Sequence, residues 1–244
     1  MVRHLNVVVI DAPLDRRLDA AGLIAVADRW LEGLPHRFLR VDDEAGARAL
    51  EGGLVRAGWQ RSRTVMMLRD PGPAPALDPR ARPITPAEHE AVMLANVSVG
   101  DYGVEASPEL PGLLVDAEQR MLAGTSSLMF GAGEDGDLQS MCELYLDSDV
   151  EGVRMAMVEQ VATLPAYRER GLAKAVVSAA IAAARDWGAE LITVPADADD
   201  WPQIIYAGLG FENVGTQVQF TLRGERTRLP GAAARVPGAG LNGA

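Results

Sequence analysis

The sequence predicts an α+β protein with mixed α/β layers: a central mixed sheet flanked by helices, preceded by an N-terminal βαβαβ segment. Hydrophobic residues make up 48% of the 244 residues and charged residues 23%, which is ordinary for a globular chain. Strand-like and helical runs alternate along the chain, and the pattern near its end recurs near its start. Such alternation predicts helices packed on a sheet.

The composition of the sequence argues against several classes of binding partner. The longest apolar runs, such as residues 7–10, are too short to span a bilayer, and the N-terminus lacks the apolar core of a signal peptide, so we expect a cytoplasmic protein with no membrane partner. One cysteine, Cys142, and three scattered histidines lack ligand spacing, so no metal is expected. A net charge of −11 argues against nucleic acid and is compatible with a cationic, amine-bearing substrate.

Two biased stretches divide the chain. Five prolines between Pro71 and Pro83 remove amide donors and favour an extended linker. The last residues are rich in Gly, Ala, Pro and Arg without a hydrophobic period, which is typical of a flexible tail. The predicted division is a half-domain at 1–70, a Pro-rich linker at 71–83, a main domain at 84–223 and a tail at 224–244.

Hydrophobic period and turn residues predict the elements of the main domain. Acidic, glycine-containing segments separate its first three strands, as in hairpins. A long alanine-rich helix ends at Gly188, a natural C-cap, and a shorter helix is closed by Gly208 and Gly210. The expected helices cover residues 86–97, 109–122, 171–187 and 201–207, and the expected strands cover 126–131, 138–146, 153–163, 191–194 and 214–222.

An internal repeat relates the N-terminal segment to the second half of the main domain. At a constant offset of 152 residues, Gly58 aligns with Gly210 and Trp59 with Phe211. Strand, helix, strand, helix and strand stay in register without a gap, so the N-terminal segment is expected to be a half-domain that needs the rest of the chain to complete its core. The alternative is two unrelated βαβ-like segments of similar length.

The segment after the strand at 153–163 has the pattern of an anion-binding loop. A short turn containing Arg168 and Arg170 leads into a helix, and Gly171 and Ala173 leave the backbone of its first turn uncovered. Free amides at a helix start attract a diphosphate, and the arginines would add charge-assisted hydrogen bonds. The structural alternative is a helix start that only tolerates small residues.

The motif Arg-Glu-Arg-Gly-Leu-Ala at 168–173 resembles the acetyl-CoA signature Gln/Arg-x-x-Gly-x-Gly/Ala of the GCN5-related N-acetyltransferase (GNAT) superfamily. The downstream element of that family, Tyr-x-x-x-Gly-Phe, resembles residues 206–211, and Asp200 stands where the family often has asparagine. The resemblance covers residues 84–222. Together with the repeat, the chain is similar to tandem GNAT proteins, with a degenerate N-terminal half-copy and a GNAT-like central sheet.

This resemblance implies an acetyl-CoA-dependent N-acetyltransferase that transfers an acetyl group to a primary amine of a small molecule or peptide by direct attack. Acetyl-CoA is the implied cosubstrate, and Tyr206 takes the place of a general acid beside the departing sulfur. The strand offers backbone groups to the pantetheine arm, and the loop holds the diphosphate. The implied cofactor-binding residues are Val161, Ala162, Thr163, Arg168, Glu169, Arg170, Gly171, Leu172, Ala173 and Lys174.

The proton acceptor is left open by the sequence. Glu159 shares a strand face with Val161 if side chains alternate, and Glu143 lies on the neighbouring strand, so either carboxylate or a water could take the proton of the amine. Both could equally bind a cationic substrate or lie on a solvated face. A non-catalytic acyl-CoA-binding module and a structural protein with a chance match are the alternatives. The acceptor, the acyl length and a homodimer also stay open.

The repeat also predicts which of the two copies binds acetyl-CoA. The first copy has Asp19 where the second has Gly171, and an aspartate there brings negative charge to the place of the diphosphate. We therefore expect one acetyl-CoA site per chain.

Overall fold

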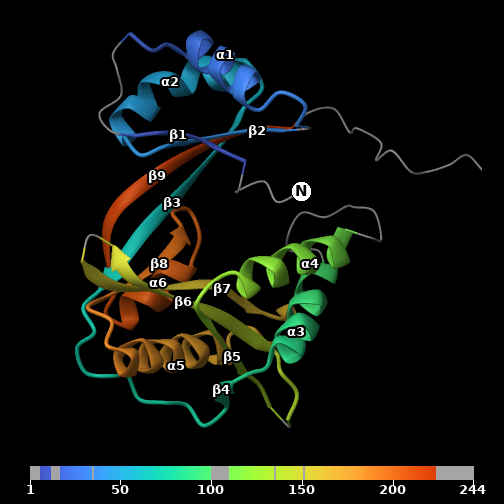
Figure 1. The fold of residues 1–244 in the computed structure, drawn as a ribbon, viewed down its shortest axis with the longest axis vertical. Helices are drawn as coiled ribbons and strands as arrows, with labels where there is room; N and C mark the ends of the chain where they lie inside the picture. The colour runs from blue at the N-terminus through green and yellow to red at the C-terminus, as the bar shows by residue number, and fades with distance from the viewer. Residues whose placement is uncertain are drawn as a thin grey trace, which may run out of the picture.

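In a computed structural model of the chain, strands from its N-terminal and C-terminal parts lie in one mixed sheet (Figure 1). The structure describes residues 6–11, 17–34, 36–99, 110–134, 136–150 and 152–223. Among these, nine strands lie in the order β1-β2-β9-β3-β8-β7-β6-β5-β4, with parallel and antiparallel neighbours, and six α-helices pack against them. The predicted fold class is confirmed.

The bounds of the elements are as follows. The strands are β1 (Val8–Ile10), β2 (His36–Val41), β3 (Gln60–Arg69), β4 (Ala81–Pro83), β5 (Ser127–Ala132), β6 (Ser140–Val150), β7 (Val153–Thr163), β8 (Leu191–Asp197) and β9 (Glu212–Arg223). The helices are α1 (Ala20–Trp30), α2 (Glu44–Arg56), α3 (Pro86–Ser98), α4 (Leu110–Ala123), α5 (Leu172–Trp187) and α6 (Pro202–Gly208). A single 3-10 turn, Pro165–Tyr167, stands between β7 and α5.

Every element predicted for the main domain is present, with bounds shifted by a few residues at most of the ends. The sequence did not predict β4, whose three residues lie inside the expected linker. They pair with β5 at the edge of the sheet, where a proline is tolerated because its missing amide faces away from the ladder. The expected tail at 224–244 lies outside the described residues.

Helices cover both faces of the main part of the sheet. The alanine-rich α5 and the short α6 pack on one face through a core that contains Val176, Ile181 and Tyr206. Helices α3 and α4 pack on the other face around Val92, Val115 and other apolar residues. No helix among the described residues has both the length and the apolar character that a membrane crossing requires.

The repeat is confirmed at its boundaries. Asp19 is the N-cap of α1 and Gly171 the N-cap of α5, at the predicted offset. Gly58 and Gly210 both have a left-handed φ, of 88° and 87°, just after α2 and α6. The next residues, Trp59 and Phe211, are both buried, and β3 and β9 begin directly after them. The two copies are thus the segments β1 to β3, called the first copy, and β7 to β9, called the second copy.

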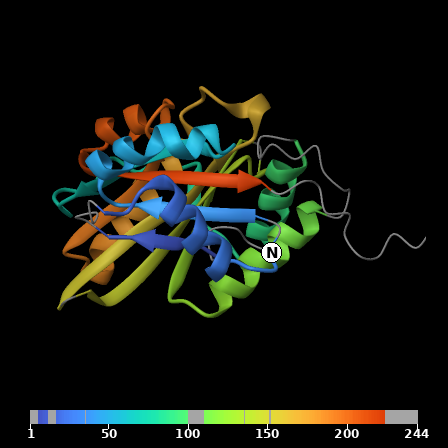
Figure 2. The same ribbon diagram turned by 90° about the horizontal axis from the view of Figure 1, so that it is seen from above.

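The two copies exchange their last strands. Strand β3 ends the first copy but lies between β8 and β9, whereas β9 ends the second copy but pairs with β2 and β3. Figure 2 shows β9 (red) running beside β2 (blue). Val65 and Met67 of β3 belong to the core of the second copy, and Val218 and Phe220 of β9 complete the core of the first copy. Each copy therefore depends on the other for a central strand.

A fragment of residues 1–70 is expected not to fold by itself. Without β9 its core loses Val218 and Phe220, and β2 and β3 both gain an unpaired edge. An amide-correlation NMR spectrum of the fragment should show the narrow dispersion of an unfolded chain, beside a dispersed spectrum of the whole protein. A dispersed spectrum of the fragment would contradict the half-domain hypothesis.

Candidate active site

Two adjoining cavities lie where the end of β7 meets α5 and α6. The first has a volume of about 340 Å³ and is lined by residues 161–163 of β7, by Tyr206 of α6 and by Asn96 of α3, among others. The second, of about 490 Å³, surrounds the start of α5. Residues that line both cavities are Thr163, Arg168, Ala173, Trp201 and Ile205. The cavities therefore form one continuous groove.

The start of α5 is open to an anion. Gly171 stands at the N-cap with φ 79°, and no side chain caps the helix. A Cβ atom there would meet only the Arg80 Nη2 atom, at 3.6 Å. In the first copy, by contrast, the carboxylate of Asp19 accepts the Gly22 amide at 2.8 Å. One helix start presents free amides with partial positive charge, whereas the other is occupied by its own aspartate.

A β-bulge in β7 turns the strand toward the groove. Gln160 has a φ of 50°, and the pairing of β6 with β7 shifts register between Met141 and Glu143. Glu159 lies opposite Glu143, whereas Val161 packs against the core beneath α5. The expected alternation, which places Glu159 and Val161 on one face, is therefore wrong, because a bulge inserts one extra residue between them.

The bulge coincides with the separation of β7 from β8. The two strands pair only over Met155–Met157, although β7 continues to Thr163. In the first copy, β1 and β2 are paired over Val8–Ile10, the positions that correspond to residues 160–162. At these positions the strands β7 and β8 of the second copy are therefore unpaired with each other, whereas β1 and β2 of the first copy are paired.

Tyr206 has the environment of a proton donor. Its ring is buried and packs edge-on against Phe211, with ring centroids 6.2 Å apart, and the residue lines the first cavity. Burial raises the pKa of the phenol well above its usual value, and the electrostatic effects of the neighbouring Cys142 and Glu159 add to the shift. The hydroxyl is therefore protonated at neutral pH and has a proton to give.

A buried polar cluster lies on the other face of β6 and β7, beneath α3 and α4. The His89 Nε2 atom is 2.8 Å from Glu143 Oε1, and the Tyr145 hydroxyl donates to Glu143 Oε2 at 2.6 Å. The same hydroxyl is 3.2 Å from Glu118 Oε1, and the Gln160 amide donates to Glu118 Oε2 at 3.3 Å. Glu118 thus holds the side chain of the bulged residue.

Burial raises the pKa of two carboxyls in this cluster. Burial, which is the largest cause, and the charge of Glu143 together raise the pKa of Glu159 and the pKa of Glu118 to about 7. Glu143 is itself fully buried, with one oxygen on His89 and the other on Tyr145. Neither Glu143 nor Glu159 lines the two cavities. The charge of Glu159 nevertheless raises the pKa of Tyr206.

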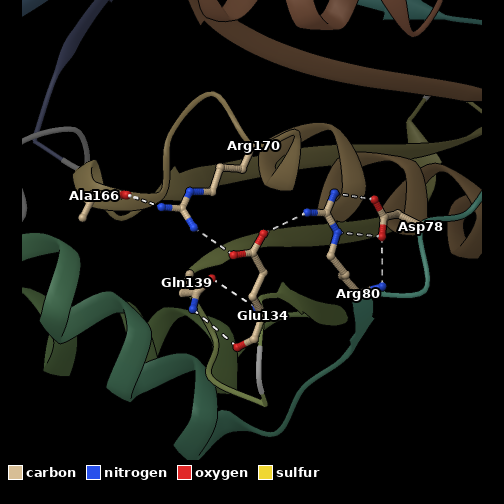
Figure 3. Close-up of polar contacts among 6 residues, drawn as sticks. All are labelled: Asp78, Arg80, Glu134, Gln139, Ala166 and Arg170. Carbon is tan, nitrogen blue, oxygen red and sulfur yellow. Dashed lines mark hydrogen bonds and ion pairs between the residues drawn. The ribbon is translucent and has the colours of Figure 1, made fainter.

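The structure brings most of the predicted cofactor residues to the groove, with one exception. Arg170 lines neither cavity. Its Nη1 atom pairs with Glu134 at 2.9 Å and its Nη2 atom donates to the Ala166 carbonyl at 3.4 Å (Figure 3). Glu134 also pairs with Arg80, at 3.4 Å. Arg170 is therefore engaged in holding the turn onto the β5–β6 hairpin.

Several residues of the site had no signal in the sequence. Asn96 reaches the first cavity from α3, and His89 and Glu118 join the buried cluster from α3 and α4. They match no motif, because their position depends on how α3 and α4 pack across the sheet. Within the described part of the chain, His, Cys, Asp and Glu side chains nowhere form a group suited to a metal ion.

Comparison with known proteins finds a family match within the main domain. Residues 94–211 match the model of the Acetyltransferase (GNAT) family. The match lies within the main domain and covers just under half of the chain, so this part of the chain is similar to a GNAT domain. The family comprises N-acetyltransferases that use acetyl-CoA. No curated protein matches the sequence.

Solved structures share the fold over most of the chain. A tandem GNAT protein from the clavulanic acid biosynthesis pathway superposes with a TM-score of 0.56 at 17% identity, covering 85% of this chain and 70% of that one. A GCN5-related N-acetyltransferase from Sphaerobacter thermophilus gives 0.57 at 15% identity, covering 89% and 73%. A conserved protein of unknown function from Staphylococcus epidermidis gives 0.59 at 9% identity, covering 84% and 81%. The fold of this chain is thus shared over most of its length with solved structures that include a tandem GNAT protein.

Proposed function

We propose that the GNAT domain transfers an acetyl group from acetyl-CoA to a primary amine of a small molecule or peptide. The observation that carries the proposal is the continuous groove that runs from the uncapped start of α5 to the buried Tyr206. The first copy, residues 1–70, supplies β3 to the sheet and binds no acetyl-CoA, because its helix start is filled by Asp19. The linker at 71–83 joins it to the GNAT domain at 84–223.

In this proposal the groove binds acetyl-CoA mainly through the backbone. The amides at the start of α5 and the side chain of Arg168 hold the diphosphate, while the pantetheine arm lies along residues 161–163. The extra residue of the bulge leaves a backbone group outside the strand ladder. An amide near Val161 then stabilises the oxyanion as the amine attacks the thioester carbon. The C–S bond breaks, and Tyr206 protonates the departing thiolate.

Glu159 is the proposed proton acceptor, acting through a water. Because its pKa is about 7, Glu159 is mostly ionised above neutral pH, and its charge raises the pKa of Tyr206. Glu143 has both oxygens engaged, which favours a positioning role for it beside His89.

Acetyl transfer is expected to rise with pH through about 7, because Glu159 accepts a proton only when ionised and burial holds its pKa near that value. Glu159→Gln should lower kcat by roughly a hundredfold to ten-thousandfold and remove this rise. Glu90→Gln, an exposed position on α3, is the matched control and should leave the profile unchanged. A normal profile in Glu159→Gln would instead assign the proton to water alone.

The function itself is tested by thiol release. Purified protein is incubated with acetyl-CoA and a panel of primary amines, from polyamines to peptide N-termini, and free CoA is measured against an amine-free blank. Amine-dependent release supports the transferase. Tight acetyl-CoA binding without release over the panel would favour the alternative, a non-catalytic acyl-CoA-binding module. No binding at all would refute both.

A further inference from the structure

The bulge in β7 places a side chain where the backbone alone favours glycine. Two residues of β7, Gln160 and Val161, stand opposite the single residue Cys142 of β6, because the pairing shifts register there. The φ of Gln160 is 50°, in the left-handed region that glycine adopts at no steric cost in such a bulge. A glutamine at this position therefore needs a contact of its side chain that offsets the strain.

Glu118 of α4 supplies that contact. The side-chain amide of Gln160 donates to Glu118 Oε2 at 3.3 Å, between residues that are far apart in sequence. Only 4% of the surface of Glu118 is exposed, and a carboxyl is rarely buried to this degree unless it has partners. The helix lies over this face of the sheet, since Val115, one turn before Glu118, shares a core cluster with Met141 of β6. The packing of α4 thus brings Glu118 to the bulge.

The contacts of Tyr145 indicate that Glu118 is a neutral acid. Tyr145 has one hydroxyl proton and two carboxyl neighbours, Glu143 Oε2 at 2.6 Å and Glu118 Oε1 at 3.2 Å. Its proton lies on the shorter contact, toward Glu143. The longer contact is then also a hydrogen bond only when Glu118 carries a proton on Oε1 and donates it to the Tyr145 oxygen. In that form Oε2 of Glu118 still accepts from Gln160, and every contact of the carboxyl is satisfied.

The surroundings of Glu118 favour this neutral form. Burial, the largest cause, and the charge of Glu143 raise its pKa to about 7. The titratable groups that face it are Glu143 and Tyr145 on β6, Glu159 on β7 and His89 on α3. Burial also raises the pKa of Tyr145 far above its usual range, so that hydroxyl keeps its proton. Glu118 lines neither cavity, and it is therefore not placed to take a proton from a bound amine.

We propose that Glu118 is a positioning residue of the acetyl-transfer site, which holds the side chain of Gln160 and so fixes the bulge that aims the amide near Val161 at the thioester oxygen. The inference rests on the proposed function, which places that amide at the oxyanion. Its new content is that α4, none of whose described residues lines either cavity, sets the geometry of the transfer site from the other face of the sheet. A donor stabilises a developing oxyanion only while its distance and direction are held, so a loosened bulge slows the reaction.

The first test follows the thioester carbonyl by NMR, with acetyl-CoA that carries an isotopic label at its carbonyl carbon. An amide that donates to the carbonyl oxygen polarises the group, so the resonance of acetyl-CoA bound to the wild type should lie downfield of that of free acetyl-CoA. Gln160→Ala and Glu118→Ala each remove one partner of the contact and should lose most of this shift, while acetyl-CoA affinity stays close to that of the wild type. Glu118→Gln should keep the shift, because its amide nitrogen can donate to Tyr145 and its oxygen can accept from Gln160, as the neutral acid does.

The second test measures the same effect as a rate, with the amines of the thiol-release panel. Gln160→Ala and Glu118→Ala should each lower kcat by roughly tenfold to a hundredfold, the range of a slightly misplaced catalytic group, with little change in the KM for acetyl-CoA. The double variant should lose no more than the larger single loss, because both substitutions break one contact. Asp116→Ala removes an exposed carboxylate from the same helix and is the matched control, which should leave both the shift and kcat unchanged.

The outcomes separate the role of Glu118 from the proposed function. A carbonyl shift that survives in Gln160→Ala, additive losses in the double variant, or a loss in Glu118→Gln as large as in Glu118→Ala would overturn the positioning role, while amine-dependent release by the wild type still supports the transferase. Thermal melts show which variants fold, and if the buried Glu118→Ala does not, Gln160→Ala and Glu118→Gln decide the question. Failure of the wild type to bind acetyl-CoA would overturn the proposed function and the positioning role with it.

Discussion

Gly171→Asp is expected to weaken acetyl-CoA binding by at least about a hundredfold, which corresponds to about 3 kcal/mol. The substitution recreates in α5 the aspartate that caps α1, and that carboxylate would occupy the free amides and repel the diphosphate. Space alone does not oppose the new side chain, because a Cβ atom at Gly171 meets only Arg80 Nη2 at 3.6 Å. Steric crowding is therefore not the cause of the expected loss, which leaves the charge of the aspartate and the strain of a side chain at a φ of 79°.

Gly171→Asn separates charge from backbone strain. Asparagine tolerates the left-handed φ of 79° about as well as aspartate and has nearly the same shape, but it carries no charge. We expect it to retain most of the affinity that the aspartate variant loses. Calorimetry on both variants, with thermal melts to show that they fold, measures the difference. Equal losses in the two variants would mean that strain, rather than charge at the diphosphate site, decides binding.

The reverse substitution, Asp19→Gly, is expected not to create a second site. It removes the capping carboxylate, but β1 and β2 stay paired over Val8–Ile10, so no gap opens beside the helix start. Calorimetry should give one site per chain for the wild type and for this variant. A second site in Asp19→Gly would show that the aspartate alone disables the first copy, and two sites in the wild type would contradict the degenerate-copy hypothesis.

Tyr206→Phe should lower kcat by roughly a hundredfold to ten-thousandfold, the range of a lost general acid, with little change in acetyl-CoA affinity. The phenylalanine keeps the buried ring and its contact with Phe211 and removes only the hydroxyl of this cavity-lining residue. Steady-state kinetics with a fixed amine and calorimetry with acetyl-CoA measure the two quantities. A comparable fall in affinity would point to a binding role for the hydroxyl.

Cys142→Ala is the companion variant and is expected to remain active. Burial raises the pKa of its thiol far above the usual range, and its Sγ atom contacts the Val176 carbonyl at 3.5 Å within the core beneath α5. A thiol that stays protonated is a poor nucleophile, so no acetyl-enzyme should form. Trapping an acetyl thioester on Cys142, or a folded but inactive alanine variant, would replace direct attack by a two-step transfer.

Local signals were sufficient for every predicted element of the main domain and for the loop that precedes α5, but not for β4. Each helix of the main domain has its own hydrophobic period, and Gly188 and Gly210 follow helices at positions with a left-handed φ. The loop at 168–173 is equally local, because the free amides of a helix start belong to consecutive residues. The repeat could be found for the same reason: its matched positions, such as Gly58 and Gly210, carry the same local requirement in both copies.

Arg170 and Glu159 show where local inference stops. The motif includes Arg170, but its guanidinium pairs with Glu134 of the β5–β6 hairpin, which is distant in sequence. The positive charge of Arg170 therefore does not line the groove. For Glu159, the alternation of side chains predicts one face and the bulge at Gln160 imposes the other. A bulge depends on the pairing of two strands, and the sequence of one strand does not encode it.

By itself, then, the sequence determined that this chain folds as helices on a mixed sheet, has a loop that resembles an acetyl-CoA signature, and repeats that unit with Asp19 at the start of the corresponding helix. All of these follow from neighbours along the chain, where hydrogen bonding within a turn or a helix is settled locally. Only the tertiary structure decided that β3 and β9 change places, that β7 parts from β8 in one copy alone, and that Glu118 of α4 reaches the bulge of β7. Each of these joins residues far apart in sequence, and the free energy of such contacts depends on burying apolar surface and pairing backbone groups across the whole molecule.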